Sequence, residues 1–139
     1  MKVVMTICSK EKDSTNRDLT AHQRYKSTRI KAVSEVAKQD KLPFFILSGK
    51  YGLVAENDII PYYDYLLEQD GIEDTVSLVN KQSKLIGITS VDFYAKPKAG
   101  SWAPYYEVLE SMATELGIEL NIISSEPQSP NTGVALSAR

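Results

Sequence analysis

A short glycine-containing segment follows the apolar run at 44–47 and carries the clearest chemical signal in the chain. Its residues are Ser48-Gly49-Lys50-Tyr51-Gly52. The two glycines permit positive φ angles or a close approach of the backbone to a ligand, and Lys50 places a cation beside free backbone N–H groups. Such a turn suits an anion or the polar edge of a nucleobase. An ordinary turn after a strand uses the same residue types, so both interpretations stay open.

Two common nucleotide-binding motifs do not occur in this sequence. A P-loop that ended at Gly49-Lys50 would require a glycine at position 44, where the chain has Phe44. The Gly-x-Gly-x-x-Gly dinucleotide pattern is not found either. A phosphate or a base must therefore be bound by a different arrangement.

An acidic residue stands among aromatic residues in the segment Tyr62-Tyr63-Asp64-Tyr65. Aromatic surroundings raise the pKa of a carboxyl group toward the range of a general acid or base, and the rings offer stacking faces for a nucleobase. Asp64 is therefore the candidate catalytic residue, and Tyr63 is a candidate ligand contact. The alternative is that Asp64 caps a turn and that the tyrosines only pack.

Basic residues are concentrated in the first quarter of the chain. Arg29 shares a helical face with Tyr25 near the start of a predicted helix, where a guanidinium can hold a phosphate or a carboxylate at two points. Alternatively, its stem packs and its head pairs with an acid at the edge of the domain. The remaining cations suit either phosphate binding or a solvated helix face: Lys10, Lys12, Arg17, Arg24, Lys26 and Lys31.

The apolar pattern predicts the elements that position these residues. Short apolar runs predict strands at 3–8, 44–47, 91–95 and 120–123, and the first two are expected to be buried. Apolar spacing of three and four residues predicts helices from about 21 to 40, over 73–85 and over 105–116. This alternation predicts an α/β fold, an open and mostly parallel sheet of about four strands with helices on both faces, as a three-layer sandwich. We expect one domain over 1–123 and an extended or disordered tail over 124–139.

Ligands of open parallel sheets bind beyond the carboxyl ends of the strands. The loops after the first two predicted strands therefore share one edge of the sheet. An insertion at 57–71, longer than the usual connection, reaches the same edge. The predicted ligand-binding residues are Ser9, Lys10, Tyr25, Arg29, Ser48, Lys50, Tyr51, Gly52 and Tyr63.

Composition limits the function classes. The 139 residues include 16 Lys plus Arg and 18 Asp plus Glu, a net charge of −2, which excludes a strongly basic nucleic-acid coat but not a local basic patch. The single cysteine, Cys8, cannot form an internal disulfide and no charged-then-apolar leader precedes it, so we expect a cytoplasmic protein. The apolar run at 43–47 is far shorter than the roughly 20 residues of a membrane span. We therefore expect no membrane partner, and the single histidine, His22, suggests no metal or other cofactor.

Three ordered motifs carry a family resemblance. They are Phe44-Phe45-Ile46-Leu47-Ser48-Gly49-Lys50-Tyr51-Gly52-Leu53-Val54, Tyr25-Lys26-Ser27-x-Arg29 and Tyr63-Asp64-Tyr65-Leu66-Leu67. The first resembles the LSAKYGLV segment of a small, largely uncharacterised bacterial and phage α/β family, which is similar to the YaaA peroxide-stress proteins and to the α/β domain of archaeosine synthase. The others resemble its Y-x-S-x-R/K helix start and its Y-D-x-x-L element. Gly49 stands where the family more often has alanine, a difference that we expect to be harmless.

The resemblance implies a nucleobase, nucleotide or nucleic-acid ligand, in nucleic-acid modification, stress response or damage limitation. Our first hypothesis is a nucleobase-, nucleoside- or nucleotide-binding protein whose candidate reaction is hydrolysis of an N-glycosidic bond, with Asp64 supporting the cationic centre or orienting water. The second is a non-catalytic nucleic-acid-binding or partner-binding module in stress or phage biology. Its support is the cationic first quarter and the tyrosine-rich loop.

Overall fold

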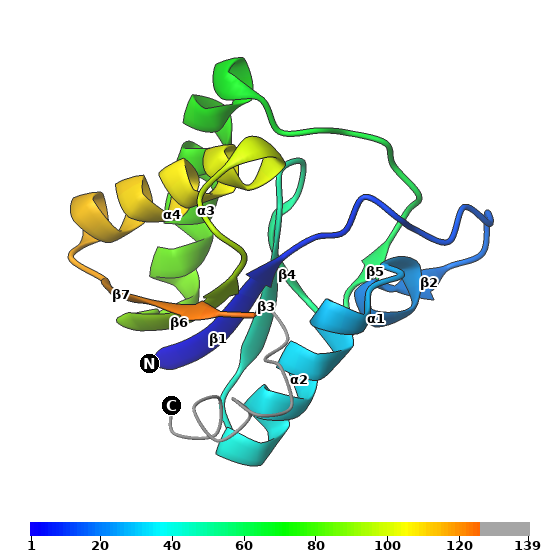
Figure 1. The fold of residues 1–139 in the computed structure, drawn as a ribbon, viewed down its shortest axis with the longest axis horizontal. Helices are drawn as coiled ribbons and strands as arrows, with labels where there is room; N and C mark the ends of the chain where they lie inside the picture. Colours follow the sequence, from blue (N-terminus) through cyan, green and yellow to red (C-terminus); the bar gives the residue numbers. More distant parts are fainter. Residues whose placement is uncertain (126–139) are drawn as a thin grey trace.

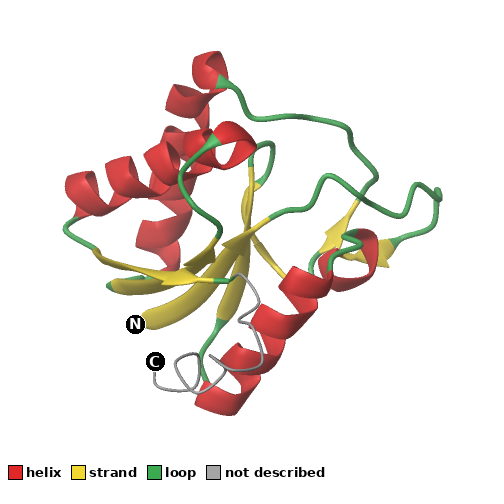
Figure 2. Cartoon of the chain, in the orientation of Figure 1, coloured by secondary structure: helices red, strands yellow, loops and turns green. Residues whose placement is uncertain are grey.

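The computed structural model describes residues 1–125 and contains a five-stranded sheet in the order β4-β3-β1-β6-β7 (Figures 1 and 2). Its strands are β1 (Lys2–Ile7), β3 (Phe44–Ser48), β4 (Gly52–Ala55), β6 (Ser90–Ala95) and β7 (Glu119–Ser124). β1 pairs in parallel with β3 and β6, β6 pairs in parallel with β7, and β4 runs antiparallel to β3. The predicted α/β fold with a mostly parallel sheet is confirmed, with five strands instead of four.

The additional strand, β4, follows directly from the glycine-containing turn. Ser48 pairs with Gly52 across a tight hairpin, and Gly52 adopts a φ of +70°, which a glycine accepts without strain. Only the short apolar pair Leu53 and Val54 marks this strand in the sequence. A pattern of two residues is too short to distinguish a strand from a loop, so β4 was not among the four predicted strands.

The helices are α1 (Ala21–Arg24), α2 (Thr28–Asp40), α3 (Ile72–Ile86) and α4 (Ala103–Leu116). Two 3-10 turns, η1 (Gln69–Gly71) and η2 (Gly100–Trp102), precede α3 and α4. A two-stranded antiparallel sheet pairs β2 (Leu19–Thr20) with β5 (Ile59–Ile60). The predicted helices at 73–85 and 105–116 are therefore confirmed, with boundaries shifted by one or two residues.

The helix predicted from about 21 to 40 is interrupted between α1 and α2. Tyr25 and Ser27 have extended backbone conformations, and the Ser27 hydroxyl accepts a hydrogen bond from the N–H of Ile30 to begin α2. The interruption allows the N–H of Lys26 to donate to the carbonyl of Glu11 at 3.0 Å. The hydrogen bond between Lys26 and the loop at Glu11 therefore interrupts the helix, although the apolar spacing of the sequence is continuous.

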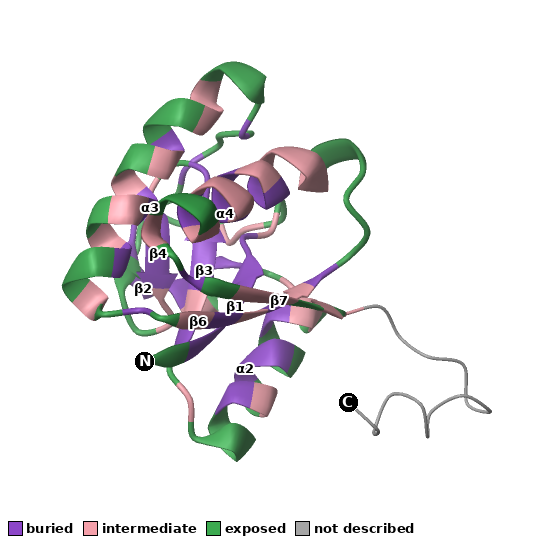
Figure 3. Ribbon diagram, turned by 90° about the vertical axis from the view of Figure 1, so that its left-hand side faces the viewer, coloured by how far each residue is buried: buried purple, intermediate pink, exposed green. Residues whose placement is uncertain are grey.

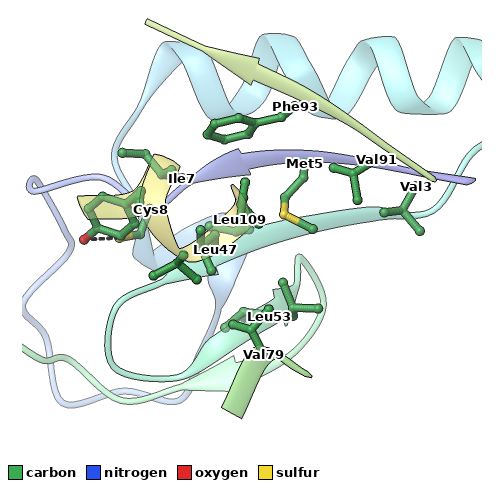
Figure 4. Close-up of a cluster of buried hydrophobic side chains, with 14 of the residues drawn as sticks. Val3, Met5, Ile7, Cys8, Leu47, Leu53, Val79, Val91, Phe93 and Leu109 are labelled. Atoms are coloured by element: carbon green, nitrogen blue, oxygen red, sulfur yellow. Dashed lines mark hydrogen bonds between the residues drawn. The ribbon is translucent and has the colours of Figure 1, made fainter. Parts of the chain in front are cut away.

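The core is centred on β1, whose residues from Val3 to Ile7 are all buried (Figure 3). In Figure 1, α3 and α4 lie side by side above the sheet and α2 lies below it. Met5, Phe93 and Leu109 belong to the apolar cluster drawn in Figure 4, and all three are completely buried. This packing holds the carboxyl ends of β1 and β3 at one end of the sheet.

The predicted tail begins within the last strand. Ser124 ends β7, one residue beyond the predicted end of that strand, and residues 126–139 lie outside the described part of the chain. Among the described residues, no helix combines the length and the apolar character that a membrane crossing needs.

Candidate functional site

The carboxyl ends of β1 and β3 lie next to each other. Ile7 pairs with Leu47, and the N–H of Cys8 donates to the carbonyl of Leu47 at 2.9 Å. The loop after β1 and the hairpin after β3 therefore begin at the same edge of the sheet. This juxtaposition brings the predicted segment at 48–52 beside the loop that starts at Ser9.

A chain of three buried hydroxyl groups lies at this edge. Ser48 Oγ accepts hydrogen bonds from the N–H groups of Lys50 (3.2 Å) and Tyr51 (3.0 Å), so its own hydrogen is free to donate to Tyr63 Oη, 3.0 Å away. The Tyr63 hydroxyl then donates to Tyr25 Oη at 2.5 Å. Burial raises the pKa of both tyrosines above the usual value. Both phenols are therefore neutral at physiological pH and serve as hydrogen-bonding groups.

Two lysines lie over the ring of Tyr63. The Nζ atom of Lys12 is 4.5 Å from the ring centre, and the Nζ atom of Lys50 is 5.9 Å from it. The Tyr51 ring meets the Tyr63 ring edge to face, with centres 5.1 Å apart, and Lys50 Nζ also lies 5.5 Å from the centre of the Tyr51 ring. Within residues 1–125 neither lysine forms an ion pair. Both ammonium groups are therefore available to an anion.

Arg29 is half-buried at the beginning of α2 and is bound to the end of β1. Its Nη1 atom donates to Thr6 Oγ1 at 2.6 Å and to the carbonyl of Ile7 at 3.0 Å, and Nη2 donates to the carbonyl of Cys8 at 3.5 Å. The guanidinium also lies 4.9 Å from the centre of the Trp102 ring. Burial lowers the pKa of Arg29 from its usual value. Arg29 therefore orders the end of β1, and its described partners are the Thr6 hydroxyl and two carbonyl oxygens instead of an acid.

Asp64 lies apart from this group. It is exposed, whereas its neighbour Tyr63 is only 4% exposed, and no hydrogen bond or ion pair joins Asp64 to another described residue. Tyr62 and Tyr65 on either side are also exposed. The aromatic enclosure that the sequence suggested for this carboxyl group is therefore not formed.

Two other predicted residues make local contacts only. The Ser9 hydroxyl donates to the carbonyl of Glu11 at 2.6 Å, and the exposed Lys10 accepts a long hydrogen bond of 3.4 Å from Lys12 at its carbonyl. The structure thus brings five predicted residues together in hydrogen bonds and ring contacts, namely Tyr25, Ser48, Lys50, Tyr51 and Tyr63.

The hairpin and the insertion pack closely against each other at Gly49. A Cβ atom built on Gly49 would lie 2.8 Å from Leu67 Cβ and 3.2 Å from the ring of Tyr65. Because Leu67 Cβ is fixed to the backbone, the chain would have to move to accommodate alanine. Glycine at this position therefore avoids a steric conflict that alanine would create in this chain.

Gly52 is also held in a close contact, with α3. The side chain of Gln82 donates to the carbonyls of Tyr51 and Leu53, both at 3.2 Å, and accepts from the N–H of Leu53 at 2.7 Å. These three bonds fasten the hairpin to α3. Gln82 gave no local signal in the sequence, because its role depends on which strand α3 covers.

Arg24 is the second residue whose role the sequence did not reveal. It is 1% exposed and donates to four backbone carbonyls, those of Ile60, Asp13, Thr15 and Arg17. These bonds attach the loop after Lys12 to the strand that leads to Tyr63. The sequence showed only one more basic residue in a basic region.

A cavity of about 270 Å³ lies beside Lys50. Its lining includes Lys50, the exposed Tyr65, the backbone at Gly49 and the hydroxyl-bearing Thr75, which donates to the carbonyl of Gly49 at 2.9 Å. Asp74 also lines this cavity. No group of three or more His, Cys, Asp or Glu side chains that could hold a metal ion occurs in residues 1–125.

Comparison with known families places this geometry in context. A model of DUF6884, described as a family of unknown function, matches residues 3–96. The match includes β1, α2, the β3–β4 hairpin and the loop that carries Tyr63, and it ends before α4. No curated protein and no solved structure matches the chain.

Proposed function

We propose a ligand-binding function for this chain, which belongs to the DUF6884 family of unknown function: it binds a nucleotide at the carboxyl ends of β1 and β3. The observation that carries the proposal is the position of Lys12 and Lys50, whose ammonium groups both lie within 6 Å of the Tyr63 ring centre. No described carboxylate pairs with either of them.

An anionic group suits this arrangement for an electrostatic reason. Two ammonium groups near one ring repel each other, and the ring faces compensate this repulsion only in part. A phosphate bound at this edge would relieve the repulsion between Lys12 and Lys50. The surface beneath the two lysines is already ordered by the hydrogen bond between Ser48 and Tyr63. Ligand binding therefore costs less conformational entropy.

The aromatic residues favour a nucleotide over a simple anion. Tyr51 is half-buried beside Lys50, and Tyr65 presents an exposed ring to the cavity of about 270 Å³. A base can stack on such a ring while its phosphate contacts Lys50. The polar groups of Gly49 and Thr75 at the same cavity can contact the edge of the base.

We extend the proposal to the family relationship, the layering of the fold and the cellular role that the sequence suggests. It includes kinship with the YaaA and archaeosine synthase α/β domains, a three-layer arrangement of sheet and helices, and a cytoplasmic role in stress response or nucleic-acid modification. The resemblance of residues 44–54 supports this ligand class. A reaction at an N-glycosidic bond further requires Asp64 to approach the ligand from its exposed position, because the neutral phenols of Tyr25 and Tyr63 are poor bases.

Calorimetric titration with nucleoside monophosphates, nucleosides and free bases tests the proposal. We expect a monophosphate to bind and the Lys12→Ala/Lys50→Ala variant to bind it at least tenfold more weakly. A nucleoside without phosphate should be much less sensitive to the same change. Lys84→Ala, which alters an exposed lysine on α3, is the matched control. Equal monophosphate affinity in both variants, or no binding by the unaltered protein, would overturn the proposal.

The reaction has its own measurement. Release of free base from nucleosides, nucleotides and oligonucleotides should be lost in Asp64→Asn if Asp64 acts in hydrolysis. Binding without base release leaves a nucleotide-binding protein and removes the hydrolase part of the proposal.

A further inference from the structure

A second cationic region lies next to the proposed nucleotide site, at the junction of α1 and α2. Here a groove of about 660 Å³ is lined by Tyr25, by the N-cap residue Ser27 and by three cations, Arg17, Lys26 and Lys31. Its volume exceeds what a single phosphate needs. It lies outside the group of hydroxyls and rings described above, although Tyr25 belongs to both.

The charge of this groove is unbalanced. In the described part of the chain, Arg17, Lys26 and Lys31 form no ion pair, and Asp13 is the one carboxylate that lines the groove. Asp13 Oδ1 already accepts a hydrogen bond from the N–H of Thr15 at 2.9 Å. The hydrogen bonds from Thr15, and then the charges of Lys26 and Arg17, lower the pKa of Asp13. Three cations face one carboxylate, and the groove is positive.

Glu56, the acidic partner of His22, does not neutralise the cations of the groove. It lines the groove, and its Nδ1 atom lies 3.4 Å from Glu56 Oε2. The same carboxylate oxygen accepts a hydrogen bond from Ser34 Oγ at 2.7 Å. Glu56 is therefore engaged outside the groove and does not pair with its lysines.

The groove and the nucleotide site are neighbours in the chain and in space. A β-bridge joins Lys12 to Tyr25, and the N–H of Lys26 donates to the carbonyl of Glu11. Lys12 lies over the Tyr63 ring, on the nucleotide side, whereas Lys26 lines the groove. Tyr25 has its hydroxyl in the buried network and also forms part of the groove wall. A polyanion that leaves the nucleotide site past Lys12 therefore meets Lys26 next.

We infer that the ligand is a nucleotide within a single-stranded nucleic acid, whose phosphodiester backbone continues from Lys12 into the groove of Arg17, Lys26 and Lys31. This inference rests on the proposed function and extends it to a substrate class. A nucleic acid fits better than an acidic peptide, because it supplies regularly spaced phosphates together with bases. The exposed rings of Tyr62 and Tyr65, 48% and 41% accessible, are stacking faces that a peptide would not need.

A single strand is favoured over a duplex for a physical reason. A base that contacts Tyr65 and Lys50 must leave its neighbours in the stack, which requires unpairing and unstacking in a duplex and costs far less in a single strand. The net charge of the whole chain is −2, so the positive groove is a local feature and gives the strand a defined path.

Fluorescence anisotropy with a labelled oligothymidylate of about ten nucleotides, within the usual length range of single-strand sites, tests the inference. We expect Lys26→Ala/Lys31→Ala to weaken oligonucleotide binding at least tenfold at low salt. Loss of two phosphate contacts should reduce the slope of log affinity against log salt by about 1.4. Binding of a nucleoside monophosphate should be unchanged in this variant. Lys81→Ala/Lys84→Ala on α3 is the control for total charge.

The outcomes separate the two proposals. If monophosphate binding depends on Lys12 and Lys50 but the oligonucleotide binds no more tightly, or binds equally well to Lys26→Ala/Lys31→Ala and its control, the groove inference fails and the nucleotide site stands. If no monophosphate binds, the proposed function itself fails. Equal competition by polyglutamate of similar length would indicate an acidic protein partner and would overturn the nucleic-acid assignment.

Discussion

Replacement of Arg24 by alanine is expected to destabilise the protein strongly. The guanidinium is buried and donates to the carbonyls of Ile60 (3.1 Å), Asp13 (2.7 Å), Thr15 (2.9 Å) and Arg17 (2.9 Å). No carboxylate pairs with it in residues 1–125, so these four carbonyl dipoles are what compensates its charge. Arg24 is therefore a structural clamp between the loop after Lys12 and the strand β5.

The magnitude follows from the surroundings of each bond. The bond to Ile60 is buried, so its loss costs about 1.5–3 kcal/mol, because the carbonyl keeps no partner. The other three bonds are partly buried, so water can replace the lost donor. The loss of each of these bonds therefore costs only about 0.5–1 kcal/mol. The total is about 3–6 kcal/mol, a large share of the roughly 5–15 kcal/mol that stabilise a typical domain.

Urea denaturation followed by circular dichroism measures this change. Arg24→Lys keeps the charge but lacks the planar fork, so we expect it to lose about half as much as Arg24→Ala and to remain folded. Arg17→Ala, at an exposed side chain, should change the free energy of unfolding by less than about 0.5 kcal/mol. An Arg24→Ala protein within about 1 kcal/mol of the unaltered protein would refute the clamp argument.

Three further predictions concern the nucleotide site. Gly49→Ala should cost about 1–3 kcal/mol in urea denaturation, because its Cβ would lie 2.8 Å from Leu67 Cβ; an unchanged midpoint would contradict the packing. Tyr63→Phe removes the bonds to both Ser48 and Tyr25 and should cost about 1–3 kcal/mol, more than Tyr25→Phe, which removes one; the reverse order would contradict the central position of Tyr63 in the hydroxyl chain. Stability should also fall as the pH rises above about 10, because the unfolded tyrosines ionise there while the raised pKa values of Tyr25 and Tyr63 keep the folded phenols neutral. Thermal unfolding between pH 8 and pH 11 measures this loss, and it should be smaller in Tyr63→Phe; an equal loss in both proteins would count against the buried phenols as its source.

Much of the architecture follows from local sequence patterns. The apolar runs at 3–8, 44–47, 91–95 and 120–123 correspond to the four parallel strands. In β1 and β3 nearly every residue is buried, as expected of strands covered on both faces. The amphipathic spacing at 73–85 and 105–116 likewise corresponds to α3 and α4. Since parallel strands end at a common edge, the sequence also pointed to Ser48, Lys50 and Tyr63 as neighbours.

The tertiary structure decided which of the candidate residues meet. Asp64 and Tyr63 are adjacent in sequence, but the path of the insertion buries Tyr63 and leaves Asp64 exposed. The interruption of the helix at Tyr25 depends on the pairing of Lys26 with Glu11, and the path of the loop beyond Lys12 depends on the bonds made by Arg24. The spacing of apolar residues in the sequence shows which side of a helix or strand is buried, because side-chain direction repeats with the geometry of the element. Contacts between loops have no such period, and they form only when distant segments have been brought together by the packing of the sheet.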